Sequence, residues 1–183
     1  PLTPSAMPEP PPEGPAADSL RAAALRGSLI HKLFERLPSV PPADRRQQAL
    51  DWLRAQGATN ADALAAEVLA VMEDPSHAAL FDPDALAEAP VAGLVGESVV
   101  AGVVDRLLVE PARVLVVDFK TGLRVPRNAE EAPVAHRRQM AAYAEVLKRA
   151  FPGRVVETAR LYTAAPKFVL LDEKDMAGLL PLE

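Results

Sequence analysis

The chain has no cysteine in its 183 residues. Disulfide bonds, cysteine-type zinc sites and iron–sulfur clusters are therefore excluded. It also lacks a signal-peptide pattern and any apolar run long enough to cross a membrane, so we expect a cytoplasmic protein with no membrane partner. No glycine-rich loop of the kind that cradles phosphates is found, so we do not expect ATP to bind within this chain.

Aromatic residues and positive charge are also scarce. Aromatics make up 4% of the chain against 49% hydrophobic residues, so the core must consist mainly of alanine, leucine and valine. The formal net charge is −5, which excludes a generally basic nucleic-acid binder. Any contact with DNA must therefore be local, metal-mediated or shared with other protein.

Proline crowds the start of the chain, at positions 1, 4, 8, 10, 11, 12 and 15. Such a segment favours extended, solvated backbone. We interpret residues 1–17 as an interdomain linker, cut from a longer parent chain, and residues 18–183 as one domain. An N-terminal tail left after removal of Met is the alternative.

Hydrophobic periodicity predicts helices first and strands afterwards. Helices are expected over 20–37, 44–56 and 61–73, with short turns starting at Ser76 and Asp84. Strands are expected over 91–95, 98–109 and 113–119 as an antiparallel meander, then a helix over 134–150 and strands over 155–163 and 167–171. The order predicts an α/β fold, with a mixed sheet flanked by helices, a helical part over 18–87 and a sheet part over 88–183.

Asp118 and Lys120 end one predicted strand, and Asp105 lies on the strand before it. Side chains alternate along a strand, so Asp118 and Lys120 share a face. A hairpin centred between Pro111 and Ala112 pairs residues whose numbers sum to 223, which places Asp105 opposite Asp118. Two carboxylates about 5 Å apart destabilise a sheet unless a cation neutralises them. Carboxylate oxygens are the ligands Mg²⁺ prefers, so the pattern favours metal-assisted hydrolysis of a phosphodiester.

Other polar residues allow both a functional and a structural interpretation. His31 lies one helical turn after Gly27, and a glycine within a helix suggests close approach of another group. Gln139 and Tyr143 share a helix face and either support the site or form a half-buried pair. Glu88 is either a further acidic ligand, a partner of the lysine, or an exposed acid before a strand.

The remaining candidates have plainer interpretations. Glu97 is expected in a hairpin turn, His77 and His136 are expected to be exposed, and Trp52 is expected in the core. Arginines at 127, 137 and 138 either touch a DNA backbone or are simply solvated.

Four short elements together resemble the RecB-type branch of the PD-(D/E)XK nucleases, most closely the C-terminal nuclease domain of AddA helicase–nuclease subunits. The elements are Gly27-x-x-x-His31, Gly102-x-x-Asp105-Arg106, Asp118-Phe119-Lys120-Thr121-Gly122 and Gln139-x-x-x-Tyr143, and the resemblance covers about residues 20–171. It implies a restriction-endonuclease-like fold. It also implies Mg²⁺ or Mn²⁺ held by His31, Asp105, Asp118 and the backbone carbonyl of Phe119.

In that family Lys120 corresponds to the catalytic lysine, acting with Asp105 and Asp118, while Gln139 and Tyr143 support the site and contact DNA. The resemblance further implies an ATP-driven helicase in the same parent chain, an AddB-like partner subunit, and a role in double-strand-break repair and recombination as an exonuclease. A catalytically inactive domain of the same fold that guides DNA or docks a subunit is the rival hypothesis. A free-standing nuclease is a third.

Overall fold

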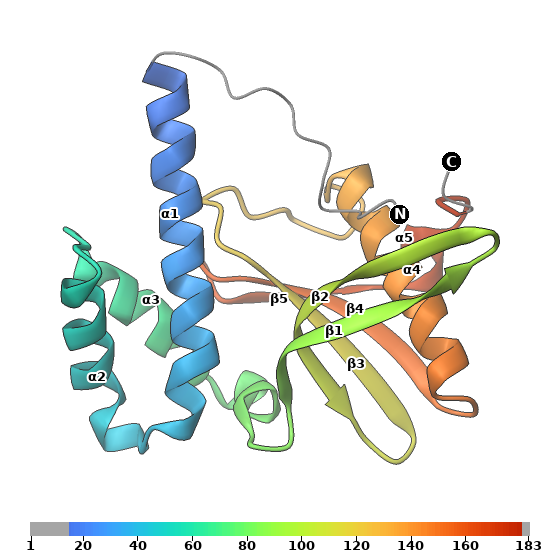
Figure 1. Ribbon diagram of the computed structural model, residues 1–183, viewed down its shortest axis with the longest axis horizontal. Coiled ribbons are helices and arrows are strands. Elements are labelled where there is room, and N and C mark those ends of the chain that lie inside the picture. The colour runs from blue at the N-terminus through green and yellow to red at the C-terminus, as the bar shows by residue number, and fades with distance from the viewer. Residues whose placement is uncertain (1–14, 181–183) are drawn as a thin grey trace.

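The computed structural model describes residues 15–180 (Figure 1). The element order is α1 (Pro15–Arg36), η1 (Leu37–Ser39), α2 (Pro42–Ala55), α3 (Ala61–Met72), η2 (Pro75–Phe81), β1 (Leu86–Val95), β2 (Ser98–Val109), β3 (Arg113–Lys120), α4 (Val134–Ala150), β4 (Val155–Tyr162), β5 (Lys167–Leu171) and α5 (Glu173–Met176). Most of the predicted linker lies outside the described residues, and its last three residues already belong to α1.

Five strands form one mixed sheet, as the sequence predicted, and they lie in the order β1-β2-β3-β4-β5. Strands β1, β2 and β3 form the antiparallel meander, and Gly96-Glu97 makes the first turn, with Gly96 at φ +60°. Helix α4 then carries the chain back, so that β4 runs parallel to β3. Strand β5 returns antiparallel at the far edge.

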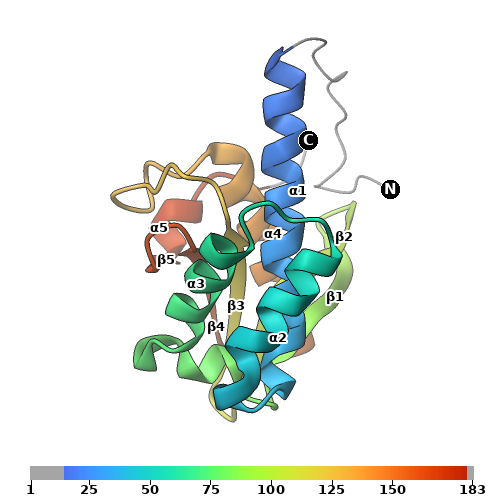
Figure 2. The same ribbon diagram turned by 90° about the vertical axis from the view of Figure 1, so that its left-hand side faces the viewer.

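Helices cover both faces of this sheet (Figures 1 and 2). Helices α1, α2 and α3 pack on one face around Leu33, Phe34 and Phe119. Helix α4 packs on the other, where Met140 and Tyr143 are buried against valines of β1, β2 and β3. The sheet therefore lies between the helical part and α4.

Strand β1 begins at Leu86, five residues earlier than predicted, so Glu88 lies within a strand rather than before one. The segment Leu86-Ala87-Glu88-Ala89-Pro90 has weak strand propensity, but pairing with β2 overrides it. Pro90 is tolerated because β1 is an edge strand. Glu88 adopts φ +48°, a left-handed conformation that non-glycine residues seldom adopt.

Side-chain alternation along β2 changes at the same level. Val100 and Val104 face α4, yet Leu107 also belongs to the cluster beneath α4, while Leu108 belongs to the opposite one. An even-numbered and an odd-numbered residue share one face only if the strand is locally irregular between them. The irregularity lies between Val104 and Leu107, next to Glu88 and its left-handed backbone on β1.

One histidine is placed differently from expectation. His77 is only 4% exposed, so the prediction that it is exposed was wrong. It lies in η2, with its ring 6.1 Å from the ring of Phe168 and its Nδ1 3.8 Å from a carboxylate oxygen of Asp74. Trp52 is partly buried against the core, and the guanidinium of Arg36 lies over its ring.

Candidate active site

Four charged residues lie in one row across the first four strands. Glu88 falls between the pairs Ala87↔Arg106 and Ala89↔Val104, so it faces Asp105. All four pairs between β2 and β3 have numbers that sum to 223, as predicted, and the same register places Asp118 opposite Asp105. On the other side, Asp118 pairs with Arg160 of β4. The row therefore holds three acids and one arginine.

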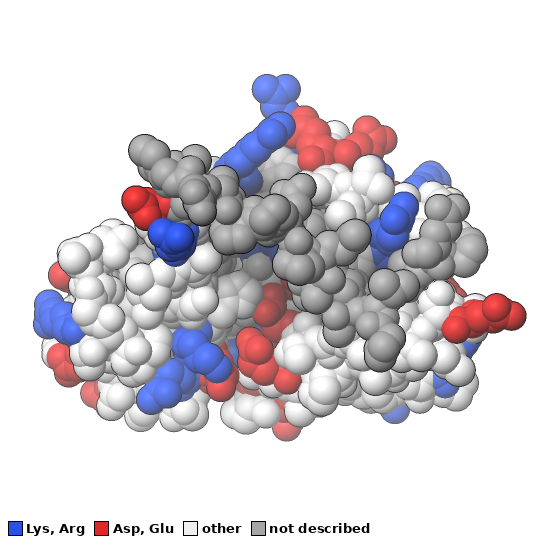
Figure 3. Space-filling model, turned by 45° about the horizontal axis from the view of Figure 1, so that its top comes forward, with Lys and Arg blue, Asp and Glu red and all other residues white. Residues whose placement is uncertain are grey.

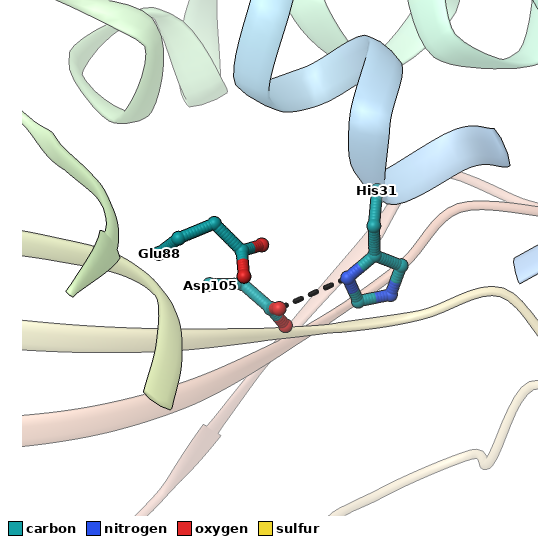
Figure 4. A group of neighbouring side chains, drawn as sticks. All are labelled: His31, Glu88 and Asp105. Atoms are coloured by element: carbon teal, nitrogen blue, oxygen red, sulfur yellow. Dashed lines mark hydrogen bonds and ion pairs between the residues drawn. The ribbon is translucent and has the colours of Figure 1, made fainter. Parts of the chain in front are cut away.

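His31 reaches this row from α1 (Figure 4). Its Nδ1 lies 2.9 Å from Oδ1 of Asp105, and Oδ2 of Asp105 accepts a 2.6 Å hydrogen bond from the backbone N–H of Phe119. Both oxygens of Asp105 are thus fixed, one by the helical part and one by β3. Phe119 meets the site through its N–H here, and the predicted role of its carbonyl as a metal ligand stays a prediction.

His31, Glu88 and Asp105 form a group that can hold a metal ion. Each offers one ligand atom, and these atoms lie within 4.8 Å of one another. Two carboxylates and an imidazole are a donor set that accepts a divalent cation such as Mg²⁺ or Mn²⁺. The residues present therefore fit a divalent metal, and Glu88, which the sequence offered as a further acidic ligand, belongs to the group. The predicted role of Asp118 as a metal ligand stays a prediction.

Asp118 forms ion pairs with two positively charged side chains. Its Oδ2 lies 2.8 Å from Nζ of Lys120 and 3.5 Å from Nη2 of Arg160. The side chain of Asp118 is 18% exposed and that of Lys120 26% exposed, so the amine borders solvent while the carboxylate is mostly covered. Asp118 and Lys120 share a face, as the alternation of the strand predicted.

Burial and neighbouring charges shift the pKa values of three residues of the site. Burial, together with the neighbouring Asp105, raises the pKa of Glu88. Burial also raises the pKa of Asp118 even though Lys120 opposes the shift. For His31, burial lowers the pKa, but the hydrogen bond and charge of Asp105 outweigh burial and the net shift is upward. A cation bound beside these residues would offset the part of each shift that the neighbouring carboxylates contribute.

Arg160 is a site residue that the sequence reasoning missed. Its side chain has no exposed surface, and its Nη1 lies 2.7 Å from Nδ1 of His136. His136 was predicted to be exposed, but it is partly buried in α4 and faces this guanidinium. Burial and then the charge of Arg160 lower the pKa of His136 to about 4, so its Nδ1 is a neutral acceptor at neutral pH.

Gln139 and Tyr143 share a face of α4, as predicted, and Nε2 of Gln139 lies 3.3 Å from the Tyr143 hydroxyl. That hydroxyl lies against Gly102 of β2, where a Cβ would be only 2.0 Å away. The glycine at the start of the Gly102-x-x-Asp105 element thus makes room for the tyrosine. This contact ties α4 to the strand that carries Asp105.

A cleft of about 450 Å³ opens beside Lys120. Its lining includes His31, Phe119, Arg124, His136 and Arg160. Acidic side chains gather in the furrow between the helical part and the sheet part (Figure 3). Among the arginines considered as DNA contacts, Arg137 donates to the carbonyl of Asp175, so that guanidinium is engaged within the fold.

Comparison with known proteins supports the resemblance at the level of the superfamily. The family model of the PD-(D/E)XK nuclease superfamily matches residues 8–175. The chain belongs to the PD-(D/E)XK nuclease superfamily. The mixed five-stranded sheet with helices on both faces is the fold expected for this superfamily, whose nucleases generally use divalent metals.

Other comparisons add little to the superfamily assignment. No curated protein matches the chain. Among solved structures, the one titled "Crystal structure of SSO0001" is 15% identical, with 85% of this chain and 83% of that chain covered, at a TM-score of 0.35. A TM-score this low carries no argument about this chain, and the superfamily assignment rests on the family model alone. None of the described helices is long and apolar enough to cross a membrane.

Proposed function

We propose that this PD-(D/E)XK domain is a Mg²⁺- or Mn²⁺-dependent deoxyribonuclease that hydrolyses phosphodiester bonds in DNA. The observation that carries the proposal is that a group of possible metal ligands lies beside an acid that holds a lysine amine. His31, Glu88 and Asp105 offer ligand atoms within 4.8 Å of one another, and the next acid of the row, Asp118, holds Lys120 at 2.8 Å. A purely structural sheet gains nothing from three acids placed side by side.

Each residue has a distinct task in this mechanism. A bound divalent ion supplies Lewis acidity and a water of lowered pKa. Asp105 is held on both oxygens, by His31 and by the Phe119 N–H, so it offers a preorganised carboxylate. Asp118 orients the Lys120 amine toward the cleft, where a cation stabilises negative charge that builds on the phosphate oxygens.

Tyr143 and Gln139 lie on α4, next to the row of charged residues. Tyr143 is 2% exposed and packs its hydroxyl against Gly102, which keeps β2 in place beneath α4. Gln139 is partly exposed beside it and is available to a DNA backbone. We infer a supporting role for the tyrosine and a DNA-contacting role for the glutamine.

We further propose that this nuclease is the C-terminal part of an ATP-driven helicase–nuclease that acts in double-strand-break repair and recombination. The four motif elements, which resemble the AddA branch, support this. In such an assembly the helicase and an AddB-like subunit would present the DNA, which compensates for the net charge of −5.

DNA cleavage by single-residue variants tests the proposed activity. We expect the chain to cleave DNA with Mg²⁺ or Mn²⁺ and to lose activity in EDTA. Lys120→Ala and Asp118→Asn should each lower the rate about 10²-fold or more while the circular dichroism spectrum is unchanged. Lys148→Ala is the matched control, because Lys148 also forms an ion pair with a carboxylate, that of Glu145, but lies on α4 outside the row. Equal cleavage rates in Lys120→Ala and in the wild type would refute the assignment, whereas a wild type without metal-dependent cleavage would favour the inactive DNA-guiding domain.

A further inference from the structure

The chain leaves β3 immediately after Lys120, and two other elements hold it there. The backbone N–H of Thr163, just past β4, donates a 3.0 Å hydrogen bond to the carbonyl of Lys120. Nη1 of Arg26, from α1, donates to the next carbonyl, that of Thr121. Both peptide groups that follow the catalytic lysine are therefore fixed from outside their own strand.

One carboxylate joins these two holding groups. Glu67 of α3 accepts a hydrogen bond from Nη2 of Arg26 on one oxygen and a 2.5 Å hydrogen bond from the Thr163 hydroxyl on the other. The side chains of Arg26 and Glu67 are 22% and 15% exposed, and Thr163 is 1% exposed. Hydrogen bonds to charged groups in such surroundings are stronger and more directional than exposed ones.

Gly27 lets α1 come close enough to make this contact. A Cβ at Gly27 would lie 3.0 Å from Oγ1 of Thr121, tighter than almost all real contacts. The glycine within the helix is thus explained by the close approach of the loop after β3. Arg26, its neighbour, gains its reach to Thr121 from the same approach.

We propose that Arg26, Glu67 and Thr163 are positioning residues for Lys120. They form a clamp, three side chains from α1, α3 and the end of β4, that fixes the backbone from which the lysine amine extends. The inference rests on the proposed nuclease function. Lysine has a long, flexible stem, so its amine is placed accurately only if its backbone is immobile, and a misplacement of about 1 Å can cost about 10²-fold in rate.

The clamp also gives the helical part a second task at the site. Helix α1 presents His31 to the carboxylate row and Arg26 to the chain after Lys120. The residues lie five positions apart on one helix, so a shift of α1 along its axis would disturb the metal-binding group and the lysine together.

The first test compares cleavage rates of matched variants. Thr163→Val keeps the shape of the side chain but removes the hydroxyl that Glu67 accepts from, whereas Thr163→Ser retains it. We expect kcat to fall about 10-fold or more in Thr163→Val and in Glu67→Ala, with KM within about 2-fold of the wild type, because the change affects the amine and not DNA binding. Thr163→Ser should stay within about 3-fold of the wild-type kcat.

Glu157→Ala is the control, because Glu157 also pairs with an arginine, Arg113, but at the opposite end of β3 and β4. All rates are measured at a temperature at which every variant is folded. An unchanged kcat in Thr163→Val, or the same loss in Glu157→Ala, would overturn the positioning role.

A second measurement does not depend on activity. Amide hydrogen exchange at Thr163 reports directly on the clamp, because its N–H donates to the carbonyl of Lys120. In Glu67→Ala we expect exchange at this amide to rise about 10-fold beyond any change in the buried strand amides of Val116 and Val117. Exchange that rises equally at all sites, or not at all, would exclude the clamp. A wild-type chain that never cleaves DNA would instead defeat the proposed function, and the exchange result would still decide the clamp.

Discussion

Gly102→Ala should destabilise the protein because of a single contact. A Cβ at this position would lie 2.0 Å from the hydroxyl oxygen of Tyr143, 2.9 Å from its Cζ and 3.2 Å from its Cε1. Tyr143 is 2% exposed and is surrounded by the cluster beneath α4, so the ring has little room to retreat. The oxygen must move by more than 1 Å to restore an ordinary contact, and neighbouring side chains must move with it.

The magnitude follows from two opposing effects. Overpacking a buried site costs about 1–3 kcal/mol, and a clash with a fixed aromatic ring belongs at the upper end of that range. Alanine restricts the unfolded chain more than glycine does, which offsets about 0.4–1 kcal/mol. The net loss in free energy of unfolding is therefore about 2 kcal/mol, and Tm should fall by roughly 4–8 °C for a domain of this size.

Urea unfolding of a double-mutant cycle is the assay. Tyr143→Phe alone should cost about 0.5–1.5 kcal/mol, because it removes the hydrogen bond with Gln139. In the double variant with Gly102→Ala the closest clash is gone, so the coupling energy should be about 1 kcal/mol or more in the favourable direction. Gly122→Ala is the control, since a Cβ there meets nothing within 4 Å. Wild-type stability of Gly102→Ala, or additive costs in the cycle, would refute the reasoning.

Three further predictions concern the site and its supports. The ring of His136 should titrate near pH 4 by NMR, with its signal assigned by His136→Gln. Because the side chain titrates near pH 6.5 in the unfolded chain, its contribution to stability is complete above that pH and is lost as pH falls toward 4. A measured pKa near 6.5 would contradict its burial against Arg160. Arg106→Met should cost about 2–4 kcal/mol in urea unfolding, because Arg106 is 2% exposed and donates to the carbonyl of Phe34 in the last turn of α1, and a loss below about 0.5 kcal/mol would contradict that role. Glu88→Gln should weaken Mn²⁺ binding about 10-fold by calorimetry, while the control Glu97→Gln, in the hairpin turn, should leave the affinity unchanged. Equal affinities of the two variants would remove Glu88 from the metal-binding group.

Residues near one another in sequence made part of this site predictable. The turn at Pro111-Ala112 and the alternation of the flanking strands fixed the β2–β3 register, and the observed pairs follow it. The same local rules placed Lys120 beside Asp118 and Gln139 beside Tyr143. These inferences need only the periods of a strand and a helix.

The rest depends on contacts that no local rule reveals. Glu88 joins the row because pairing with β2 extends β1 through a segment of weak strand propensity, at the cost of a left-handed backbone at Glu88. The contacts of Glu67 span 41 residues to Arg26 and 96 residues to Thr163, so only the packed fold brings the three together. A buried Arg160 looks, in sequence, like any charged residue on a half-exposed strand.

Anomalous diffraction from a crystal soaked in Mn²⁺ would locate the proposed metal site. We expect a peak bonded to His31, Glu88 and Asp105, with the Lys120 amine on the cleft side of it. A peak elsewhere, or none at millimolar Mn²⁺ in a crystal that leaves this furrow open, would contradict it.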